Sequence, residues 1–364
     1  MKTALLLMAA LLASCSSTSS STPAVTSASE RSTLSVAAES RTMIWNGVAV
    51  EGGRVFVSGP RWTGSKGPSV GVLDKAGQPQ PYPSAAWNEP GRDPAQSFVN
   101  VNAIHRDGDG HLWVIDAGVS GFGGPPVPSG PKAVAIDLRT NQVVRVYPFD
   151  ARIAGPGSYV DDIRFHGRHG YLTDAGRPGI IVLDLDSGAA RRVLDGHPSA
   201  TAPSNRPIIV DGAIVKAPDG SPLRVNADPL EVSPDGKYLY YASLHGPWSR
   251  IETRWLDDAS IPSTDLAAKV EPWADLPPTG GTAMTANGDL YFGDLATNAI
   301  KRRTAGGTIT TVLQDARLHW VDAPDIDEDG FIWLPTPQMD RVALFNGGVS
   351  NVDQPVRLYR LRVK

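Results

Sequence analysis

The sequence contains a single cysteine, Cys15, among 364 residues, so an internal disulfide framework is excluded. An excess of basic charge is also missing, because the formal net charge is −4 and the isoelectric point is near 6.0. That balance gives no electrostatic case for binding nucleic acid. Beyond the first residues, no apolar run is long enough to cross a membrane as a helix. The class of protein that these exclusions leave is a globular protein without disulfides and without a nucleic-acid partner.

The N-terminal segment has the organisation of a secretory signal. Lys2 supplies positive charge, the apolar core ALLLMAALLA follows, and LASC, which resembles the lipobox of bacterial lipoproteins, ends at Cys15. We therefore predict a signal peptide over residues 1–14, a lipidated Cys15 within a Ser/Thr-rich tether over 15–35, and a folded domain over 36–364. An ordinary secretory signal with an incidental cysteine is the alternative.

This N-terminal pattern also predicts where the protein is located. The expected place is the bacterial cell envelope, in the periplasm, at the outer membrane or on the cell surface, with the lipid as the only contact to the membrane. Ser16 follows the cysteine where an Asp would favour retention at an inner membrane. In a host with two membranes, this favours the outer one.

Glycine (37) and proline (31) are abundant, and they separate short strands rich in Val, Ile, Leu, Trp and Tyr. One hairpin pattern occurs six times, at starts that lie 41 (281 to 322) to 67 (161 to 228) residues apart. The six copies begin at Asn46, Asn102, Asp161, Asp228, Gly281 and Asp322. This period predicts an all-β fold, a six-bladed β-propeller with four-stranded blades. A strand near TLSVAA is expected to close the ring by pairing with VRLYRLRV. A β-sandwich with a second β-domain is the alternative.

Five of the six copies begin with Asn or Asp, which are depleted in strands. In a propeller, the innermost strands start beside the central channel, so these side chains are expected to converge. Carboxylate and amide oxygens suit a divalent cation, and Ca²⁺ is the first expectation, with Mg²⁺, Mn²⁺ or Zn²⁺ as alternatives. The predicted metal ligands are Asn46, Asn102, Asp161, Asp228 and Asp322. The alternative is that each side chain only caps a strand entrance.

The position of other polar residues in the repeat predicts their roles. The segment DIDEDG at 325–330 matches the start of a calcium loop, but Thr336 stands where that loop needs Glu. Asp327, Glu328 and Asp329 are therefore expected in a hairpin turn, and the role of Asp325 is left open. The acids that follow the second strands are expected to bind turn amides; they are Asp116, Asp174 and Asp294.

Two histidines are candidates for contact with a substrate. His105 comes three residues after Asn102, and His245 lies near the end of a strand. The alternative is that both are hydrogen-bonded structural residues. No histidine shows zinc-site spacing, and there is no G-x-S-x-G nucleophile motif.

From about Met43 onward, the chain resembles the bacterial form of the Yellow / major royal jelly protein family. The resemblance rests on GRVFVSGPRWTG, VNAIHRDGDGHLWVIDAG, YLTDAGRPGIIVLDL and DEDGFIWLPT, which occur in the family's order. It implies a six-bladed propeller. It also suggests either dopachrome conversion or the binding of aromatic amines in the channel, as described for insect members. The disulfide cysteines of the insect members are absent here.

A more distant similarity is to the SMP-30/gluconolactonase family, which holds a divalent cation in the channel. Asn102 and Asp322 match an Asn and an Asp of that family's site, and there the Asp is also the general base. Asn46 stands where the family has Glu, and Asp228 replaces an Asn. The similarity implies a metal-dependent hydrolase of lactonase type with Asp322 as base. The alternative is a binding or interaction module without catalysis. In either case we expect a monomer with a small-molecule ligand in the channel.

Overall fold

The computed structural model describes Met1 and residues 33–363 as a set of six four-stranded antiparallel sheets and one small hairpin. The predicted signal peptide, Cys15 and most of the tether lie outside the described residues. The first blade consists of β2 (Gly47–Glu51), β3 (Arg54–Ser58), β4 (Val70–Leu73) and β5 (Pro79–Pro81). The second consists of β6 (Val101–Arg106), β7 (His111–Asp116), β8 (Lys132–Asp137) and β9 (Gln142–Pro148). The third consists of β10 (Val160–His166), β11 (His169–Asp174), β12 (Ile180–Asp184) and β13 (Ala190–Val193).

The fourth and fifth blades follow the same order. They are β16 (Ala227–Val232), β17 (Tyr238–Ser243), β18 (Trp248–Glu252) and β19 (Glu271–Ala274), then β20 (Thr282–Met284), β21 (Leu290–Asp294), β22 (Ala299–Arg303) and β23 (Ile309–Gln314). Each blade is a simple up-and-down sheet in sequence order, which short hairpin turns allow. The prediction of a six-bladed propeller with four-stranded blades is confirmed.

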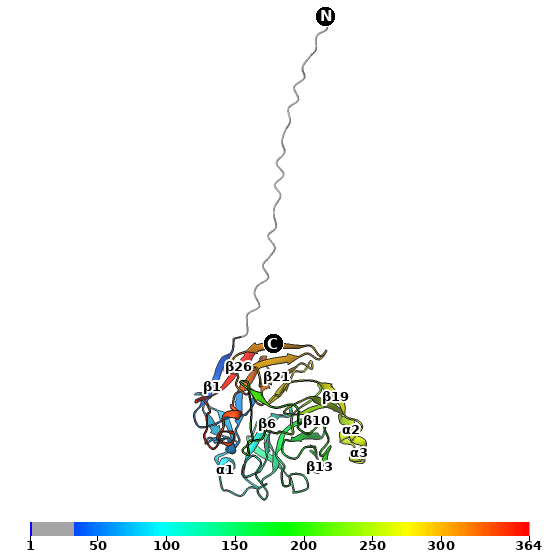
Figure 1. Ribbon diagram of the computed structural model, residues 1–364. Helices are drawn as coiled ribbons and strands as arrows, with labels where there is room; N and C mark the ends of the chain where they lie inside the picture. The colour runs from blue at the N-terminus through cyan, green and yellow to red at the C-terminus, as the bar shows by residue number, and fades with distance from the viewer. Residues whose placement is uncertain (2–32, 364) are drawn as a thin grey trace. The chain divides into compact units, whose positions relative to one another are not determined.

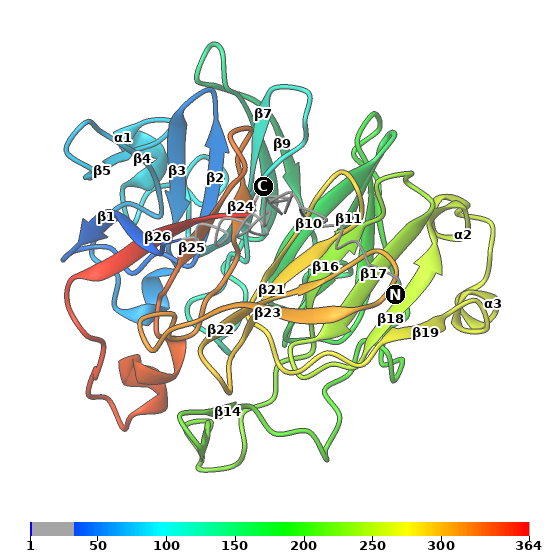
Figure 2. The same cartoon turned by 90° about the horizontal axis from the view of Figure 1, so that it is seen from above.

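The sixth blade joins the two ends of the described chain. Its strands are ordered β1 (Ser35–Ser40), β26 (Val356–Arg362), β25 (Phe331–Pro335) and β24 (Asp325–Ile326). β1 pairs antiparallel with β26, with Ser35 opposite Arg360 and Ser40 opposite Val356. Both views show the blue β1 beside the red β26 (Figures 1 and 2). The predicted closure of the ring is therefore confirmed.

The hydrophobic core lies between neighbouring blades. Central strands such as β7 and β11 bury five consecutive residues each, so both faces of these strands are covered. Between the second and third blades, for example, Trp113, Ile163 and Leu172 belong to one buried cluster. A single blade would leave such faces exposed to water, and stacking the blades removes them from it.

Segments outside the blades gather at one end of the ring. They include the 3-10 helices η1 (Arg61–Thr63), η2 (Met339–Arg341) and η3 (Ala343–Phe345) and the hairpin of β14 (Ile209–Val210) and β15 (Ala213–Ile214), which projects from the blades in Figure 2. Their apolar residues share one cluster with Trp62, Phe122 and Phe345. The three α-helices within the described residues are short: α1 (Ala85–Asn88), α2 (Thr253–Asp257) and α3 (Ser263–Ala267). None of the helices in the described part of the chain is long and apolar enough to cross a membrane.

Candidate functional site

Five polar side chains from five blades converge in the central channel. They are Asn46, Asn102, Asp161, Asp228 and Asp322, called the channel ring below, and together they line both a cavity at the channel mouth and a smaller one beneath it. Gly281, the sixth repeat start, also lines the smaller cavity and contributes no side chain. The structure thus brings together all five residues that the repeat alignment singled out as metal ligands.

Local irregularities in the inner strands help to aim three of these side chains. The pairing register shifts between Val101 and Ala103 in β6, between Val160 and Ile163 in β10, and between Ala227 and Leu230 in β16. Each shift spans a ring residue: Asn102, Asp161 and Asp228. A bulge leaves one residue out of the ladder and redirects its side chain. Three blades use this device to turn a polar residue towards the axis.

The ring residues are linked by hydrogen bonds. The Asn46 amide donates to the main-chain oxygen of Asn102 at 2.8 Å, and the Asn102 amide nitrogen donates to Asp161. Asp161 and Asp228 share a hydrogen bond, which lowers the pKa of Asp161 and raises that of Asp228. Two carboxyl groups can share a hydrogen bond only if one of them carries a proton, so this pair holds at least one proton.

Burial dominates the electrostatics of the ring. It raises the pKa of Asp161 to about 7 and the pKa values of Asp228 and Asp322 well above their ordinary range. For Asp228 and Asp322, the charge of Asp161 is the next cause. Three carboxyl groups cannot all be ionised so close together without a positive charge between them. The ring therefore holds protons at neutral pH unless a cation replaces them.

The ring has the size and the donor chemistry for one small cation. The cavity that it encloses has a volume of about 10 Å³, close to the roughly 10–15 Å³ that a single water molecule needs. Among the residues that the structure describes, no three His, Cys, Asp or Glu side chains form a metal-binding group by themselves. A cation here would therefore depend on the Asn46 and Asn102 oxygens as well as on the carboxylates, a set that suits Ca²⁺.

Aromatic side chains from separate segments surround the entrance to the ring. Trp62, Phe122, Tyr159 and Phe345, called the aromatic mouth below, line the upper cavity together with the ring. The ring centre of Trp62 lies 5.2 Å from that of Phe122 and 6.0 Å from that of Phe345, and the centre of Phe122 lies 5.1 Å from that of Tyr159. A ligand that reaches the carboxyl groups from this side passes between aromatic faces.

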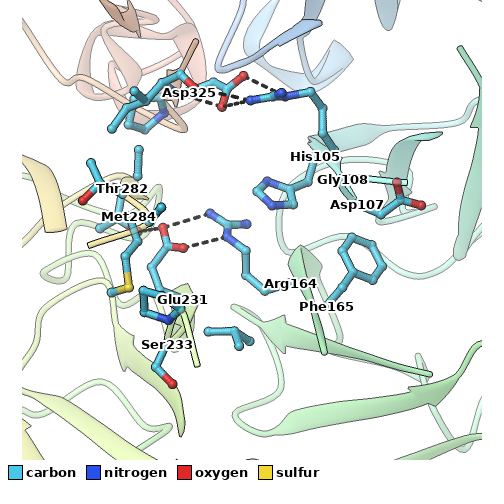
Figure 3. A pocket seen from close by; sticks show the side chains of 18 residues that line it. His105, Asp107, Gly108, Arg164, Phe165, Glu231, Ser233, Thr282, Met284 and Asp325 are labelled. Carbon is cyan, nitrogen blue, oxygen red and sulfur yellow. Dashed lines mark hydrogen bonds and ion pairs between the residues drawn. The ribbon is translucent and has the colours of Figure 1, made fainter. Parts of the chain in front are cut away.

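His105 lies at the other end of its inner strand from Asn102. It lines a cavity of about 390 Å³ together with Arg106, Arg164, Glu231 and Asp325 (Figure 3). None of the residues that line this cavity, called the rear cavity below, belongs to the channel ring. Burial and the charges of Arg164 and Arg106 hold the pKa of His105 well below its usual value. His105 is thus a neutral imidazole in a different cavity from the ring.

Two ion pairs between blades border the rear cavity. Arg106 contacts Asp325 at 3.0 Å, and Arg164 contacts Glu231 at 3.0 Å, each through two guanidinium nitrogens (Figure 3). Asp325 also accepts the main-chain N–H of Val50 at 2.7 Å. The role of Asp325, which the sequence left open, is therefore to join the sixth blade to the first and second.

His245 is buried and engaged by the main chain. Its Nδ1 lies 2.5 Å from the Arg206 oxygen, and its Nε2 accepts the N–H of Val225 at 3.2 Å. It is not among the residues that line the channel mouth, the ring cavity or the rear cavity. With both ring nitrogens occupied, His245 is placed to support the loop at residue 225 rather than to meet a ligand.

The acidic cluster at 322–329 divides between the channel and a turn. Asp327 accepts the Phe331 N–H at 2.8 Å and the indole N–H of Trp333 at 2.7 Å, and Gly330 has a positive φ of 81°. Asp107 holds Trp113 in the same way at 2.9 Å in the second blade. The prediction of a hairpin turn is confirmed, and Asp322 is the one member of the cluster in the ring.

The acids that follow the second strands have the expected structural role. Asp116 accepts the N–H groups of Val99 and Asn100, and Asp174 accepts that of Tyr159, all at 2.8 Å. They thus hold the segments that lead into the ring. Each also has a cationic partner that the sequence does not predict: Lys132 for Asp116, Arg192 for Asp174 and Lys301 for Asp294.

Sequence reasoning also missed the aromatic mouth, although two signals were present. Trp62 belongs to the segment GPRWTG that carried the family resemblance, and Tyr159 stands two residues before Asp161. Phe122 and Phe345 lie in irregular loops, far from the ring residues in sequence. No periodic pattern marks such residues, because they meet only when the blades close into a ring.

Solved propellers show the same fold at low sequence identity. A gluconolactonase from Xanthomonas campestris shares 12% identity and a TM-score of 0.55, covering 92% of this chain and 90% of its own. A calcium-binding regucalcin from Agrobacterium tumefaciens shares 12% and 0.53, covering 90% and 93%. Virginiamycin B lyase from Staphylococcus aureus shares 14% and 0.51, covering 92% and 100%. These similarities establish the fold alone.

The sequence itself points to one family. No curated protein matches the chain significantly. The family model described as "Major royal jelly protein" matches residues 99–362, which includes every ring residue except Asn46. That span covers four whole blades and three of the four strands of the sixth, and it agrees with the motifs from the second repeat onward. The chain belongs to the major royal jelly protein family.

Proposed function

We propose that the channel ring binds a divalent cation, most simply Ca²⁺, and that the protein is a hydrolase of small esters of the lactone type. The observation that carries the proposal is that five oxygen-bearing side chains from five blades enclose one cavity of about 10 Å³ beneath a single mouth. The three raised carboxyl pKa values support it, because a cation would replace the protons that the ring otherwise holds.

Each part of the site has a proposed role in the reaction. A bound cation supplies the charge that polarises the substrate carbonyl and lowers the pKa of nearby water. Asp322, as its carboxylate, accepts a proton from the attacking water as the water oxygen bonds to the carbonyl carbon. The bond from that carbon to the ring oxygen then breaks, and the ring oxygen leaves with the proton that Asp322 returns. The aromatic mouth holds the body of the substrate and limits the entry of bulk water. Tautomerisation of a cyclised catechol is the second reaction to test at the same base.

Thermal melting in the presence of Ca²⁺ or Mn²⁺ tests the cation site. The wild type should melt at a higher temperature with either ion than with a chelator, and Asp228→Ala and Asp322→Ala should lose this shift. Asp329→Ala, in an exposed turn, is the matched control and should keep it. A wild type that melts at the same temperature with and without the ions contradicts the proposal.

A lactone turnover assay tests the base. Asp322→Asn keeps the size of the side chain but removes its ability to accept a proton, so turnover should fall by about 100-fold or more. Turnover that survives the substitution would remove Asp322 from this role, whatever the result of the cation experiment.

The aromatic mouth favours a second candidate, the capture of a small aromatic amine without turnover. Trp62, Phe122 and Phe345 offer ring faces above carboxyl groups, and this combination suits a cation on a flat apolar body. Calorimetric titration with tyramine would distinguish the two. Tight binding that Phe345→Ala weakens, without turnover of any lactone, would favour the binding module over the enzyme.

The predicted anchor completes the proposal. A lipidated Cys15 would hold a monomeric domain in the bacterial envelope, through the lipid alone. Cys15→Ser should move the protein from the membrane fraction to the soluble fraction, and size-exclusion chromatography should give the mass of a single chain. A membrane association that survives the substitution would contradict the anchor.

A further inference from the structure

A chain of hydrogen bonds connects the aromatic mouth to the channel ring. The indole N–H of Trp62 donates to the hydroxyl of Tyr159 at 2.8 Å, and that hydroxyl donates to Oδ1 of Asn102 at 2.9 Å. The amide nitrogen of Asn102 then donates to Asp161. Every member therefore has one orientation, because each donor is met by one acceptor.

We propose that Tyr159 is a positioning residue that fixes the amide of Asn102 for cation binding, and that Trp62 acts through it. This inference rests on the proposed function of the ring. An amide can turn by half a rotation and exchange its oxygen for a nitrogen, which cannot bind a cation. The Tyr159 hydroxyl donates to Oδ1 and so fixes which end of the amide is the oxygen, and the Asn46 amide nitrogen, 3.5 Å from the same oxygen, is the contact that a cation would replace. Outer partners of this kind commonly change metal affinity by 10–100-fold.

The residues around Tyr159 hold its side chain, and therefore its hydroxyl, in one position. The residue is 3% exposed, its ring packs against Phe122, and its N–H is held by Asp174 at 2.8 Å. Trp62 enters from a different segment, the 3-10 helix η1, where Thr63 bonds the oxygen of Pro60 at 2.6 Å. Tyr159 is thus anchored by its own blade, and its hydroxyl receives a directed donor from outside that blade.

The experiment is a calorimetric titration of chelator-treated protein with Mn²⁺. Tyr159→Phe removes one oxygen and keeps the ring, so we expect Mn²⁺ affinity to fall by about 10–100-fold. Trp62→Phe should weaken binding less. The double variant should bind no more weakly than Tyr159→Phe alone, because Trp62 acts through the hydroxyl that is then absent. Tyr241→Phe is the matched control, since its buried hydroxyl bonds Ser199 at 2.7 Å away from the ring, and its affinity should equal that of the wild type.

The outcomes separate this inference from the function on which it rests. If the wild type binds Mn²⁺ and Tyr159→Phe binds it equally well, the positioning role is overturned while the cation site stands. Costs of the two substitutions that simply add would overturn the role of Trp62. A wild type that binds no cation overturns the proposed function and this inference together. If Tyr159→Phe fails to fold by circular dichroism, Trp62→Phe carries the test, and unchanged Mn²⁺ affinity there overturns the connection.

Discussion

At the scale of single residues, the channel ring brings carboxyl groups together where little water reaches them. Asp161 is 7% exposed, and its pKa of about 7 lies above the value near 3.9 expected in the unfolded chain. Between these two values, the native state binds more protons than the unfolded state. The stability of the cation-free protein should therefore fall as the pH rises from about 4 through about 7.

The first prediction follows from this sign. In chelator, the wild type should melt at a lower temperature at pH 8 than at pH 5.5, by at least a few degrees. Asp228→Asn should reduce the difference, because the amide donates permanently to Asp161 and adds no charge. Calorimetry at the two pH values is the measurement, with Asp329→Asn as the exposed control. A wild type that melts equally at both would contradict the shared-proton arrangement.

At the scale of elements, the blades are fastened by one repeated device. An acid at the end of the second strand accepts main-chain N–H groups and pairs with a cation from the third strand or, for Arg192, from the fourth. The pairs are Asp116–Lys132 at 2.7 Å, Asp174–Arg192 at 2.7 Å and Asp294–Lys301 at 2.6 Å. The exposure of the cation differs between blades, with 1% for the Lys132 side chain and 25% for that of Lys301. The buried Asp116–Lys132 pair should therefore contribute differently to the free energy of unfolding than the partly exposed Asp294–Lys301 pair.

The second prediction compares these two lysines. Lys132→Met leaves the carboxylate of Asp116 buried without its partner, so the free energy of unfolding should fall by about 3–5 kcal/mol. Lys301→Met should cost clearly less, since water reaches that pair. Urea denaturation of both variants is the measurement. If both variants lose the same free energy of unfolding, burial of the ion pair does not determine its contribution to stability.

At the scale of the whole molecule, the ring depends on the pairing of β1 with β26. Without β1, the outer edge of β26 would be open, and the buried side chain of Ala38 would be lost from the core of the sixth blade. The geometry of the channel ring would also change, because Asp322 in the sixth blade must face Asn46 in the first. Val48 of the first blade in turn donates its N–H to the Ala323 oxygen, next to Asp322, at 3.3 Å.

The third prediction concerns truncation. A chain that begins at residue 42 lacks β1, and it should melt on the order of 10 °C lower than the full chain and aggregate more readily. A chain that begins at residue 33 keeps β1 and should melt like the full chain. Differential scanning calorimetry of both is the measurement. If the shorter chain melts like the longer one, closure by β1 contributes little to stability.

The sequence by itself determined the blade count, the closing strands and the five blades that contribute a side chain to the channel ring. Short strands, glycine turns and a repeat period are local properties, and every copy that begins with Asn or Asp marks its own position. Asp322 could be separated from Asp327, Glu328 and Asp329 for the same reason, because alignment with distant copies distinguishes the first residue of a repeat from a turn.

Only the tertiary structure decided what surrounds those positions. His105 and Asn102 lie three residues apart in one strand yet face different cavities, and His245 turned out to bond the main chain with both ring nitrogens. The Trp62–Tyr159 contact spans 97 residues and joins two loops that have no periodic pattern. Such contacts depend on how blades and loops meet around the axis. Local propensity carries no information about them, since the physical forces that set them are packing and burial between segments far apart in the chain.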